Sequence, residues 1–560
     1  MYIFEEAVLK IKDAISCSLK ELIGKQGIDC KELPNFEVEP PTDAGHGDLY
    51  SNAALMCARI FKLPPFKIAQ MIVSNLNLEG TYAEKVEVAG PGFINFSFSQ
   101  KFFSDVVKQI LELKSGYGKN DLGKGKKIMV EFISANPTGP MHMGNARLGA
   151  LGDCLVEILK TSGYDVYKEF YVNNAGNQIE KFGMSLDVRY RQICLGESAA
   201  TMPENAYHGD DITELAQEFF DIHKDKYIDK DEETRKKALV DFALPKNINR
   251  MKSDLEKYKI IYDNWFYESD LYQDGEVDKI INILNQKNLT YKKEDALWYK
   301  ATEFGSEKDE VLVRNNGVPT YFAADIAYHY NKFITRGFDT CIDIWGADHH
   351  GHVERMKCAM EALGINKERL HVILVQLVRL VKNGEVVKMS KRSGKAVQLR
   401  DLIEEVGADA ARFIFNSQES GSGMDFDLDL AVAKNSQNPV YYVQYAHARI
   451  NSVLKKFADN KSNSPSDLSL LVEDSEKKLI YFMALYPREI IKSSKSYDSS
   501  KITRYAITLA NLFHKWYSSC KIVSEDQELT RARLELCSCV GNMIKNILCL
   551  MNVEAPEHMN

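Results

Sequence analysis

A strand, a loop rich in glycine and proline, a helix and a second strand follow one another between residues 126 and 172. KKIMVEFI is an apolar run of strand length, LGALGDCLVEILKTSG repeats leucine at helical spacing, and YDVYKEFYV again has the character of a strand. This order is a βαβ unit, which requires a parallel sheet with helices packed against it. It restricts the possible folds more strongly than any other feature of the chain.

Strand-like segments return later, at DTCIDIWG and LHVILVQLVRLV, and each is followed by a loop and a helical pattern. Together with the first unit they predict an α/β fold, a Rossmann-like doubly wound parallel sheet over residues 116–435. The intervening residues, about 177–300, are charged and helical in pattern without the rhythm of strands. We therefore expect a helical insertion within the sheet domain.

The two flanking regions predict further domains. Residues 1–115 combine helical patterns at 3–23 and 65–76 with the alternating segment VEVAGPGFINFSF, which is typical of a small α/β domain. Residues 436–560 are helical in pattern to the end and predict an all-helical domain. The expected organisation is thus three domains, with boundaries near residues 115 and 435.

Composition excludes several classes of protein. The first residues, MYIFEEAVLKIKDAIS, lack the basic start of a signal peptide, and no apolar run is long enough to span a bilayer. The eleven cysteines are scattered and form no CxxC pair. We therefore expect a cytoplasmic protein with reduced thiols, no structural zinc and no membrane association.

A formal net charge of −8 argues against a protein that coats nucleic acid, although a local face can still bind RNA. From residue 441 onwards there are 16 Lys or Arg and 13 Asp or Glu, a balance of +3, so the rest of the chain has −11. In this last region YYVQYAHARINSVLKKF offers aromatic and arginine side chains. They either pack in a helix bundle or stack on unpaired bases.

MHMGN, residues 141–145, lies between the first strand and its helix. A helix that begins at this edge of a parallel sheet presents free N–H groups to an anion such as phosphate. His142 would add a donor, and Gly144 would let a base or ribose approach the backbone. The alternative is a simple turn with a histidine at the surface.

A second loop, GEVVKMSKRSGKAVQL, places Lys388, Lys391 and Arg392 close together. Ammonium groups on such a loop can neutralise the charge that develops on a triphosphate as pyrophosphate leaves. Alone, the segment could be a solvated basic loop. We expect both loops to follow strands of one sheet, and this pairing favours a nucleotide site.

HMGN and KMSK resemble the two signature loops of class I aminoacyl-tRNA synthetases. Further segments narrow the resemblance to the arginyl-tRNA synthetase family: EFISANPTGPMHMGNAR, YVNNAGNQI, GVPTYFAADIAYH, GADHHGHVERM, NPVYYVQYAHARI, VEAPEHM, GHGDLYSNAAL and AGPGFINF. They cover essentially the whole chain. The resemblance implies an arginine–tRNA ligase with an extra N-terminal domain that binds tRNA and a helical domain that binds the anticodon.

The resemblance also implies the substrates and the residues that handle ATP. The substrates are L-arginine, tRNA(Arg) and ATP, with Mg²⁺ only as the partner of ATP, and arginine activation depends on bound tRNA. We expect a monomer. The catalytic residues are His142, Asn145, Lys388 and Lys391; ATP binding adds Gly144, Met389 and Ser390.

Asn145 departs from the family pattern, which normally has a second histidine at this place. An asparagine still offers one donor and one acceptor at short reach, but it cannot become cationic. We expect a working site in which Asn145 bonds a phosphate or ribose oxygen without adding charge.

A guanidinium requires planar acceptors, ideally carboxylates that accept paired hydrogen bonds. Carried over from the family, the arginine ligands are Glu131, Asn136, Tyr321, Asp325 and Asp348, with His349 as the alternative to Asp348. Tyr321 and Asp325 share a face if their segment is helical. Without the resemblance, Glu131 would be read as an ion pair at a strand end and Tyr321 as a core aromatic residue.

Three alternatives remain at this stage. Asp348, His349, His350 and His352 in GADHHGH could suggest zinc, but neighbouring residues in one loop seldom converge on a metal. A class I synthetase for another amino acid, such as cysteine, is disfavoured by the lack of paired cysteines. A non-catalytic RNA-binding relative is disfavoured by the intact KMSK and His142.

Overall fold

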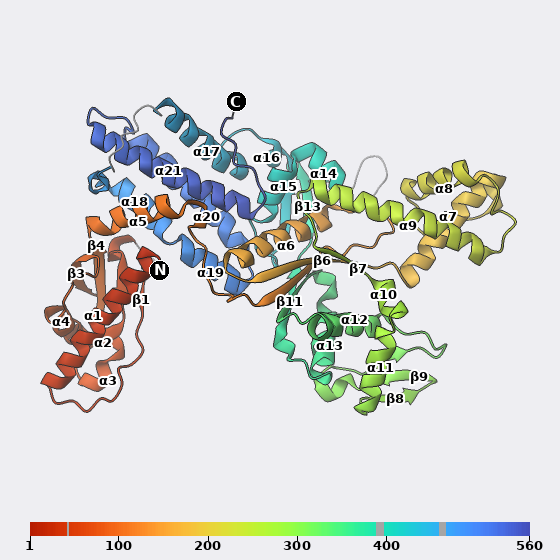
Figure 1. The fold of residues 1–560 in the computed structure, drawn as a ribbon, viewed down its shortest axis with the longest axis horizontal. Helices are drawn as coiled ribbons and strands as arrows, with labels where there is room; N and C mark the ends of the chain where they lie inside the picture. Colours follow the sequence, from red (N-terminus) through yellow and green to blue (C-terminus); the bar gives the residue numbers. More distant parts are fainter. Residues whose placement is uncertain (42–43, 388–396, 458–465, 560) are drawn as a thin grey trace.

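The computed structural model of the protein describes residues 1–41, 44–387, 397–457 and 466–559. The molecule is elongated, with the N-terminal domain at one end and a three-helix arm at the other (Figure 1). Across the described residues, no helix has the length and apolarity needed to span a bilayer. The two flanking domains and the arm surround a central sheet.

The central sheet has five parallel strands in the order β12-β11-β5-β6-β7. They are β5 (Lys127–Phe132), β6 (Asp165–Val172), β7 (Asn264–Tyr267), β11 (Thr340–Gly346) and β12 (Leu370–Val375). From β5 the chain adds β6 and β7 on one side, and from β11 it adds β12 on the other side. The predicted doubly wound sheet is therefore confirmed. The halves meet between β5 and β11, and ligands bind beyond the carboxyl ends of the strands at such a point.

Helix α6 (Met143–Thr161) follows β5, and α13 (His350–Ala362) follows β11. Helix α12 (Tyr321–Tyr330) precedes β11 and is extended by a π-helical turn, Asn331–Thr335. Leucines of α6 pack on β5 and β6 in one buried core. α6 begins beside the carboxyl end of β5, as the βαβ pattern predicts.

The segment LHVILVQLVRLV is two strands and not the single strand expected. After β12 the chain leaves the sheet: the Gln376 N–H donates to the Ser420 carbonyl, and Leu377 is 81% exposed. β13 (Val378–Lys382) then pairs with β14 (Glu385–Val386) and β15 (Met424–Asp427) in a separate sheet. The expectation that both loops follow strands of one sheet was therefore wrong, because the second follows this separate hairpin.

Residues 177–300 also differ from the expected purely helical insertion. The arm consists of α7 (Asn177–Leu195), α8 (Asp210–His223) and α9 (Glu232–Lys257), with a core of its own. The chain then returns to the central sheet as β7 and continues through α10 (Glu268–Gln273) and α11 (Glu276–Gln286). A small antiparallel sheet follows, made of β8 (Thr290–Lys293), β9 (Ala296–Tyr299) and β10 (Glu310–Val313). These strands have four residues each, too few for a clear alternation.

The N-terminal domain is a four-stranded antiparallel sheet covered by helices, in the order β1-β2-β4-β3. Its elements are α1 (Ile3–Lys25), β1 (Val38–Glu39), β2 (Leu49–Ser51), α2 (Ala53–Met56), α3 (Ala58–Phe61), α4 (Pro65–Ser74), β3 (Ala83–Ala89), β4 (Phe93–Phe98) and α5 (Gln100–Leu113). This is the small α/β unit expected from the sequence.

The C-terminal region is helical, as expected. Short helices α14 (Leu399–Val406), α15 (Ala408–Phe415) and α16 (Leu428–Val432) lead into α17 (Pro439–Lys456), α18 (Asp474–Ala484), α19 (Tyr486–Ser496), α20 (Ser500–Ser519) and α21 (Gln527–Leu550). One hydrophobic core continues from these helices into the N-terminal domain. Arg488 of α19 also pairs with Glu5 and with Glu39, so the two ends of the chain pack together.

Candidate active site

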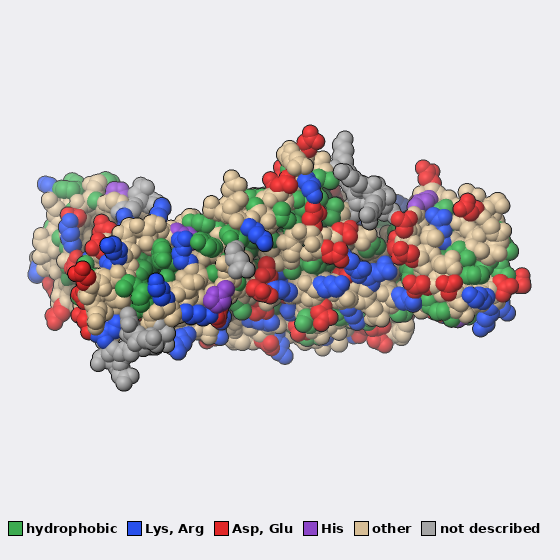
Figure 2. Space-filling view, turned by 90° about the horizontal axis from the view of Figure 1, so that it is seen from above, with side chains coloured by type: hydrophobic (Ala, Val, Ile, Leu, Met, Phe, Trp, Pro, Cys, Tyr) green, Lys and Arg blue, Asp and Glu red, His purple; other side chains and the backbone are tan. Residues whose placement is uncertain are grey.

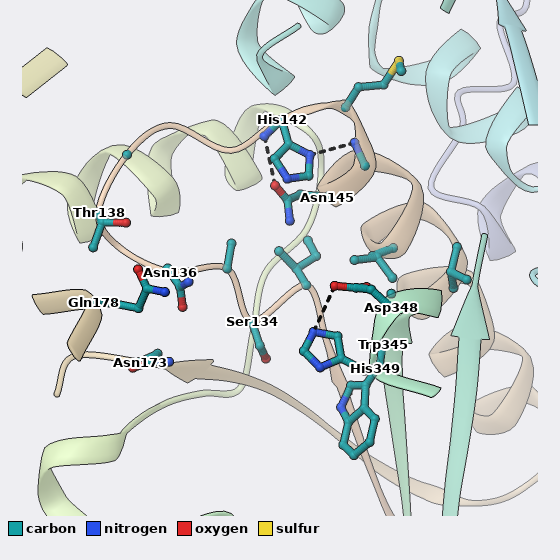
Figure 3. Close-up of a pocket in the computed structure, with 18 of the residues that line it drawn as sticks. Ser134, Asn136, Thr138, His142, Asn145, Asn173, Gln178, Trp345, Asp348 and His349 are labelled. Atoms are coloured by element: carbon teal, nitrogen blue, oxygen red, sulfur yellow. Dashed lines mark hydrogen bonds and ion pairs between the residues drawn. The ribbon is translucent and has the colours of Figure 1, made fainter. Parts of the chain in front are cut away.

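A cavity of about 1,440 Å³ lies at the carboxyl ends of the central strands. It is lined by every described residue that the sequence assigned to the site: Glu131, Asn136, His142, Gly144, Asn145, Tyr321, Asp325 and Asp348. In Figure 3 the loop after β5 passes Ser134, Asn136 and Thr138 on its way to His142, while Asp348 and His349 come from the loop after β11. Lys388, Met389, Ser390 and Lys391 lie outside the described residues.

His142 and Asn145 form a reciprocal cap at the start of α6. The His142 Nδ1 accepts a hydrogen bond from the Gly144 N–H at 3.0 Å, and the Asn145 Oδ1 accepts one from the His142 N–H at 2.9 Å (Figure 3). This arrangement satisfies two of the N–H groups that a helix start leaves open. Asn145 therefore fixes the backbone of the signature loop, a role that its sequence context alone did not indicate.

The cap also determines which ring nitrogen of His142 has the proton. Because Nδ1 accepts, the neutral ring has its hydrogen on Nε2. Burial lowers the pKa of His142, which favours this neutral donor. Gly144 leaves room for this contact, since a Cβ there would lie 2.9 Å from the His142 Cε1 and 3.0 Å from its Nδ1, and the ring would have to shift.

The second signature loop is attached to the first at its described end. Beyond residue 396, the Val397 carbonyl accepts from the Met143 N–H at 2.9 Å, and the Leu399 N–H donates to the Met141 carbonyl at 2.8 Å. Val387 and Val397 both line the cavity. The described residues on either side of 388–396 therefore lie at the same cavity as His142.

The exit from β5 has an unusual backbone. Ile133 and Ser134 have φ values of 70° and 41°, in the left-handed region that residues with a Cβ rarely adopt. The Ser134 hydroxyl donates to the Glu131 Oε1 at 2.8 Å and accepts from the Tyr171 N–H at 3.1 Å. These bonds hold the turn that leads the chain around the cavity.

Glu131 lines the cavity but is only 6% exposed. Its Oε2 lies 2.6 Å from the Nζ of Lys332, which is 2.8 Å from the Asp343 Oδ1; His329 bonds the other Asp343 oxygen at 2.7 Å. Burial opposes ionisation of Asp343, but Lys332 and His329 hold the pKa of its carboxyl at about 2. The strand-end ion pair considered from the sequence is thus present, within a buried network beneath the cavity.

Tyr321 and Asp325 lie on the first turns of α12, whose N-terminus is capped by Thr320. The Tyr321 hydroxyl accepts from the Asn177 N–H, so it is a polar wall of the cavity and not a core residue. The Asp325 Oδ2 lies 3.0 Å from the His352 Nε2. Asp348 has a side chain that is 83% exposed, and its nearest described charge partner is His349 at 3.7 Å.

Glu268 is a cavity residue that the sequence reading missed. It follows β7 directly and is 2% exposed, and its Oε1 has no hydrogen-bond partner among the described residues. With the Asn173 amide oriented to donate, its nitrogen bonds the Glu268 Oε2 at 2.7 Å. Burial, and then the nearby Asp325, raise the pKa of the Glu268 carboxyl to about 8. The missed signal was an acidic residue at the carboxyl end of a sheet strand.

Among the described residues, no group of three or more His, Cys, Asp or Glu is arranged to hold a metal ion. The cavity instead combines a helix start and a neutral imidazole with two acidic side chains, Glu268 and Asp325. Such a cavity suits a ligand with an anionic part and a cationic part.

Models of known protein families match the chain along its length. They are the arginyl tRNA synthetase N terminal domain at residues 9–98, the catalytic domain of class I (R) tRNA synthetases at 106–456, and the DALR anticodon binding domain at 443–559. The arginine–tRNA ligases of Caldanaerobacter subterraneus subsp. tengcongensis and Ruminiclostridium cellulolyticum are 52% and 50% identical, over 100% and 98% of both chains.

Solved structures agree with these matches. A putative arginyl tRNA synthetase from Campylobacter jejuni aligns with a TM-score of 0.74 and 34% identity, covering 82% of this chain and 100% of the other. The arginyl-tRNA synthetase of Thermus thermophilus aligns over 98% and 99% with a TM-score of 0.74; at 20% identity this likeness shows the fold alone. The chain belongs to the arginyl-tRNA synthetase family, a family of class I aminoacyl-tRNA synthetases.

Proposed function

We propose that the protein is an arginine–tRNA ligase that activates L-arginine with ATP and transfers it to the 3′ end of tRNA(Arg). The observation that supports this best is that one cavity is lined by the start of α6, by Val387 and Val397 on either side of residues 388–396, and by the acidic side chains of Glu268 and Asp325. Nucleotide and guanidinium would then bind at the two ends of one site. A cytoplasmic location and a monomeric state remain predictions.

In the activation step the arginine carboxylate attacks the α-phosphorus of ATP, and pyrophosphate leaves with the electrons of the broken P–O bond. The His142 Nε2–H and the N–H groups of α6 would bind phosphate oxygens. Asn145 supports this phosphate binding because it holds the backbone of the loop at His142. Gly144 supports it because it leaves room for the His142 ring. Lys388 and Lys391 are proposed to neutralise charge on the leaving pyrophosphate, and Met389 and Ser390 to contact ATP. The Mg²⁺ that accompanies ATP would add positive charge beside the phosphates.

At the other end, Glu268 and Asp325 are proposed to bind the guanidinium and Tyr321 to border it. Glu131 would hold the α-amino group, since its Oε1 faces the exit from β5. Asn136 and Asp348 would add polar contacts at the rim. In the second step the terminal ribose hydroxyl of the tRNA attacks the arginyl carbonyl, and AMP leaves.

Nucleic-acid binding through local faces is consistent with the surface. Figure 2 shows basic and acidic side chains interspersed along one face of the molecule, without a continuous basic stripe. A protein of this charge pattern is suited to one shaped RNA partner more than to nucleic acid in general.

Aminoacylation of total tRNA, with each amino acid supplied in turn, tests the proposed function directly. We expect charging with arginine and background levels with lysine and cysteine. Charging with another amino acid, or with none, would contradict the proposal.

Arginine activation is expected to require bound tRNA. Exchange of labelled pyrophosphate into ATP should be near background with ATP, Mg²⁺ and arginine alone, and should appear when tRNA(Arg) is added. A preparation of tRNA without tRNA(Arg) is the control. Strong exchange in the absence of tRNA would contradict this expectation.

Substitutions at Asn145 separate capping from chemistry. In Asn145→Ala, the His142 N–H loses its acceptor, so we expect kcat for aminoacylation to fall about tenfold, with a loss of stability of about 1 kcal/mol. Asn145→His should retain activity within about threefold, because an imidazole nitrogen can accept the same hydrogen bond. Steady-state kinetics and thermal unfolding measure both effects. Equal losses in the two variants would show that the asparagine amide itself is needed.

A further inference from the structure

His352, on the first turn of α13, contacts the predicted guanidinium ligand Asp325 from behind. Its Nε2 lies 3.0 Å from the Asp325 Oδ2. Asp325 and His352 line both the main cavity and a second cavity of about 510 Å³ beside the small sheet. The pair thus forms part of the wall between the two cavities.

Arg355, one helical turn further along α13, determines which hydrogen His352 presents. Its Nη2 lies 3.1 Å from the His352 Nδ1, and its Nη1 lies 3.0 Å from the Glu310 Oε1 on β10. A guanidinium can only donate, so Nδ1 must accept and the neutral ring has its hydrogen on Nε2. His352 therefore donates to Asp325.

Packing holds the imidazole in this position. The ring of Phe322 meets it edge to face at 5.8 Å between centroids, and the ring of Trp345 lies at 5.5 Å. The Arg355 guanidinium also lies 5.8 Å from the Phe322 ring centre and bonds the Gly351 carbonyl. Through Phe322 and Glu310, Arg355 therefore connects α13 with α12 and β10. Figure 1 shows α12 and α13 side by side.

The arrangement leaves one Asp325 oxygen for a ligand. Among the described residues, His352 is the only side chain that bonds the Asp325 carboxylate, and it occupies Oδ2. Oδ1 and the unpartnered Glu268 Oε1 then remain as acceptors. A neutral donor suits this position, because a lysine or arginine there would compete with the substrate's cation for the same carboxylate.

We propose that His352 is a positioning residue for arginine selection, held by Arg355 and Glu310 so that Asp325 presents one oxygen to the guanidinium. The inference rests on the proposed function. Without His352, no other described side chain bonds the Asp325 carboxylate, so the carboxylate would be free to rotate away from the substrate.

The test is steady-state aminoacylation of tRNA(Arg) by purified full-length variants. In His352→Ala, KM for arginine should rise about 20-fold, while kcat and KM for ATP stay within about twofold. His352→Gln should recover to within about threefold of wild type, because its amide can both donate to Asp325 and accept from Arg355. Arg355→Met should raise KM for arginine about fivefold and leave KM for ATP unchanged.

His350→Ala is the matched control, since His350 is an exposed histidine on the same helix turn. Thermal unfolding identifies any variant that is destabilised. If His352→Ala is destabilised, the kinetics of His352→Gln and Arg355→Met decide whether His352 positions Asp325. Parallel changes in kcat and both KM values, or no recovery in His352→Gln, would overturn the proposal. A wild-type enzyme that fails to charge tRNA(Arg) with arginine would instead overturn the proposed function.

Discussion

Replacing Glu268 by glutamine is expected to raise KM for arginine about 100-fold, close to 3 kcal/mol of binding free energy. Glutamine keeps the shape of the buried side chain but removes the charge that the guanidinium would meet. KM for ATP should change by less than about twofold, because Glu268 follows β7, whereas the proposed phosphate contacts are at the start of α6. Steady-state aminoacylation measures both constants.

The pH dependence gives a second measurement of the same group. Burial and Asp325 raise the pKa of Glu268 to about 8, so its carboxyl is largely protonated at pH 7 when the site is empty. Binding of a guanidinium then releases this proton. In the wild type, kcat/KM for arginine should therefore rise almost tenfold per pH unit below about 7.5 and level off above 8. In Glu268→Gln this dependence should disappear.

Glu276→Gln on the neighbouring helix α11 is the control, because Glu276 is paired with Lys279 and does not line the cavity. It should match the wild type in KM for arginine and in its pH profile. A Glu268→Gln enzyme with an unchanged KM for arginine would remove Glu268 from the proposed binding site.

The central sheet was predictable because its strands have clear patterns. Most residues of β5, β6 and β11 are buried, and most are apolar or aromatic, while α6 has leucines at helical spacing. The break between β12 and β13 was not predictable. LHVILVQLVRLV is apolar throughout, and the break depends on a hydrogen bond to Ser420, a residue far away in the sequence.

The packing of the two ends of the chain was also hidden. The apolar faces of α1 and α5 predict that they are buried, but the sequence does not say against what. In the structure these helices share one hydrophobic core with α18 and α21, which follow more than 300 residues later in the sequence. Contacts over such a separation leave no local pattern.

The site was predictable where the residues stand in motifs. His142 and Gly144 lie at the helix start that the βαβ pattern predicts, and Tyr321 and Asp325 share the face of a helix. Glu268 follows a four-residue strand in a region that reads as charged and helical, so the sheet edge next to it was not recognised. The pairing of Glu131 with Lys332 depends on the π-helical turn after α12, and a single sequence gives no sign of such a turn.

Arg412 is expected to give the largest effect on stability. This fully buried side chain of α15 donates to the Met551 carbonyl at 2.6 Å and to the Tyr258 carbonyl at 2.9 Å, and it pairs with Asp153 of α6 at 2.5 Å. Arg412→Met would leave Asp153 buried with Lys168 at 3.2 Å as its only described cationic partner. We expect the free energy of unfolding to fall by about 3–5 kcal/mol. Faster hydrogen exchange of the α6 amides measures this loss.

Lowering the pH should reduce the loss of stability caused by Arg412→Met. Burial alone would raise the pKa of Asp153, but Arg412 and Lys168 hold it below its ordinary value. A carboxyl with a lowered pKa in the folded state stabilises the protein above its unfolded pKa of about 3.9, and this contribution is lost as the pH falls through the folded value. The difference between Arg412→Met and wild type should therefore be largest near neutral pH. Arg379→Met, which breaks an exposed pair with Asp425, is the control and should cost less than about 1 kcal/mol.

A double variant decides whether the ion pair itself is responsible. Adding Asp153→Asn to Arg412→Met removes the buried charge that the single variant leaves without its arginine, and the amide oxygen still accepts from Asn552, now 2.7 Å from the Asp153 Oδ2. The double variant should therefore be more stable than Arg412→Met by about 1 kcal/mol or more. Because Met551 and Asn552 follow α21, the helix end there should exchange faster together with α6. If α6 alone responds, the network does not couple the C-terminal helices to the helix that begins at His142.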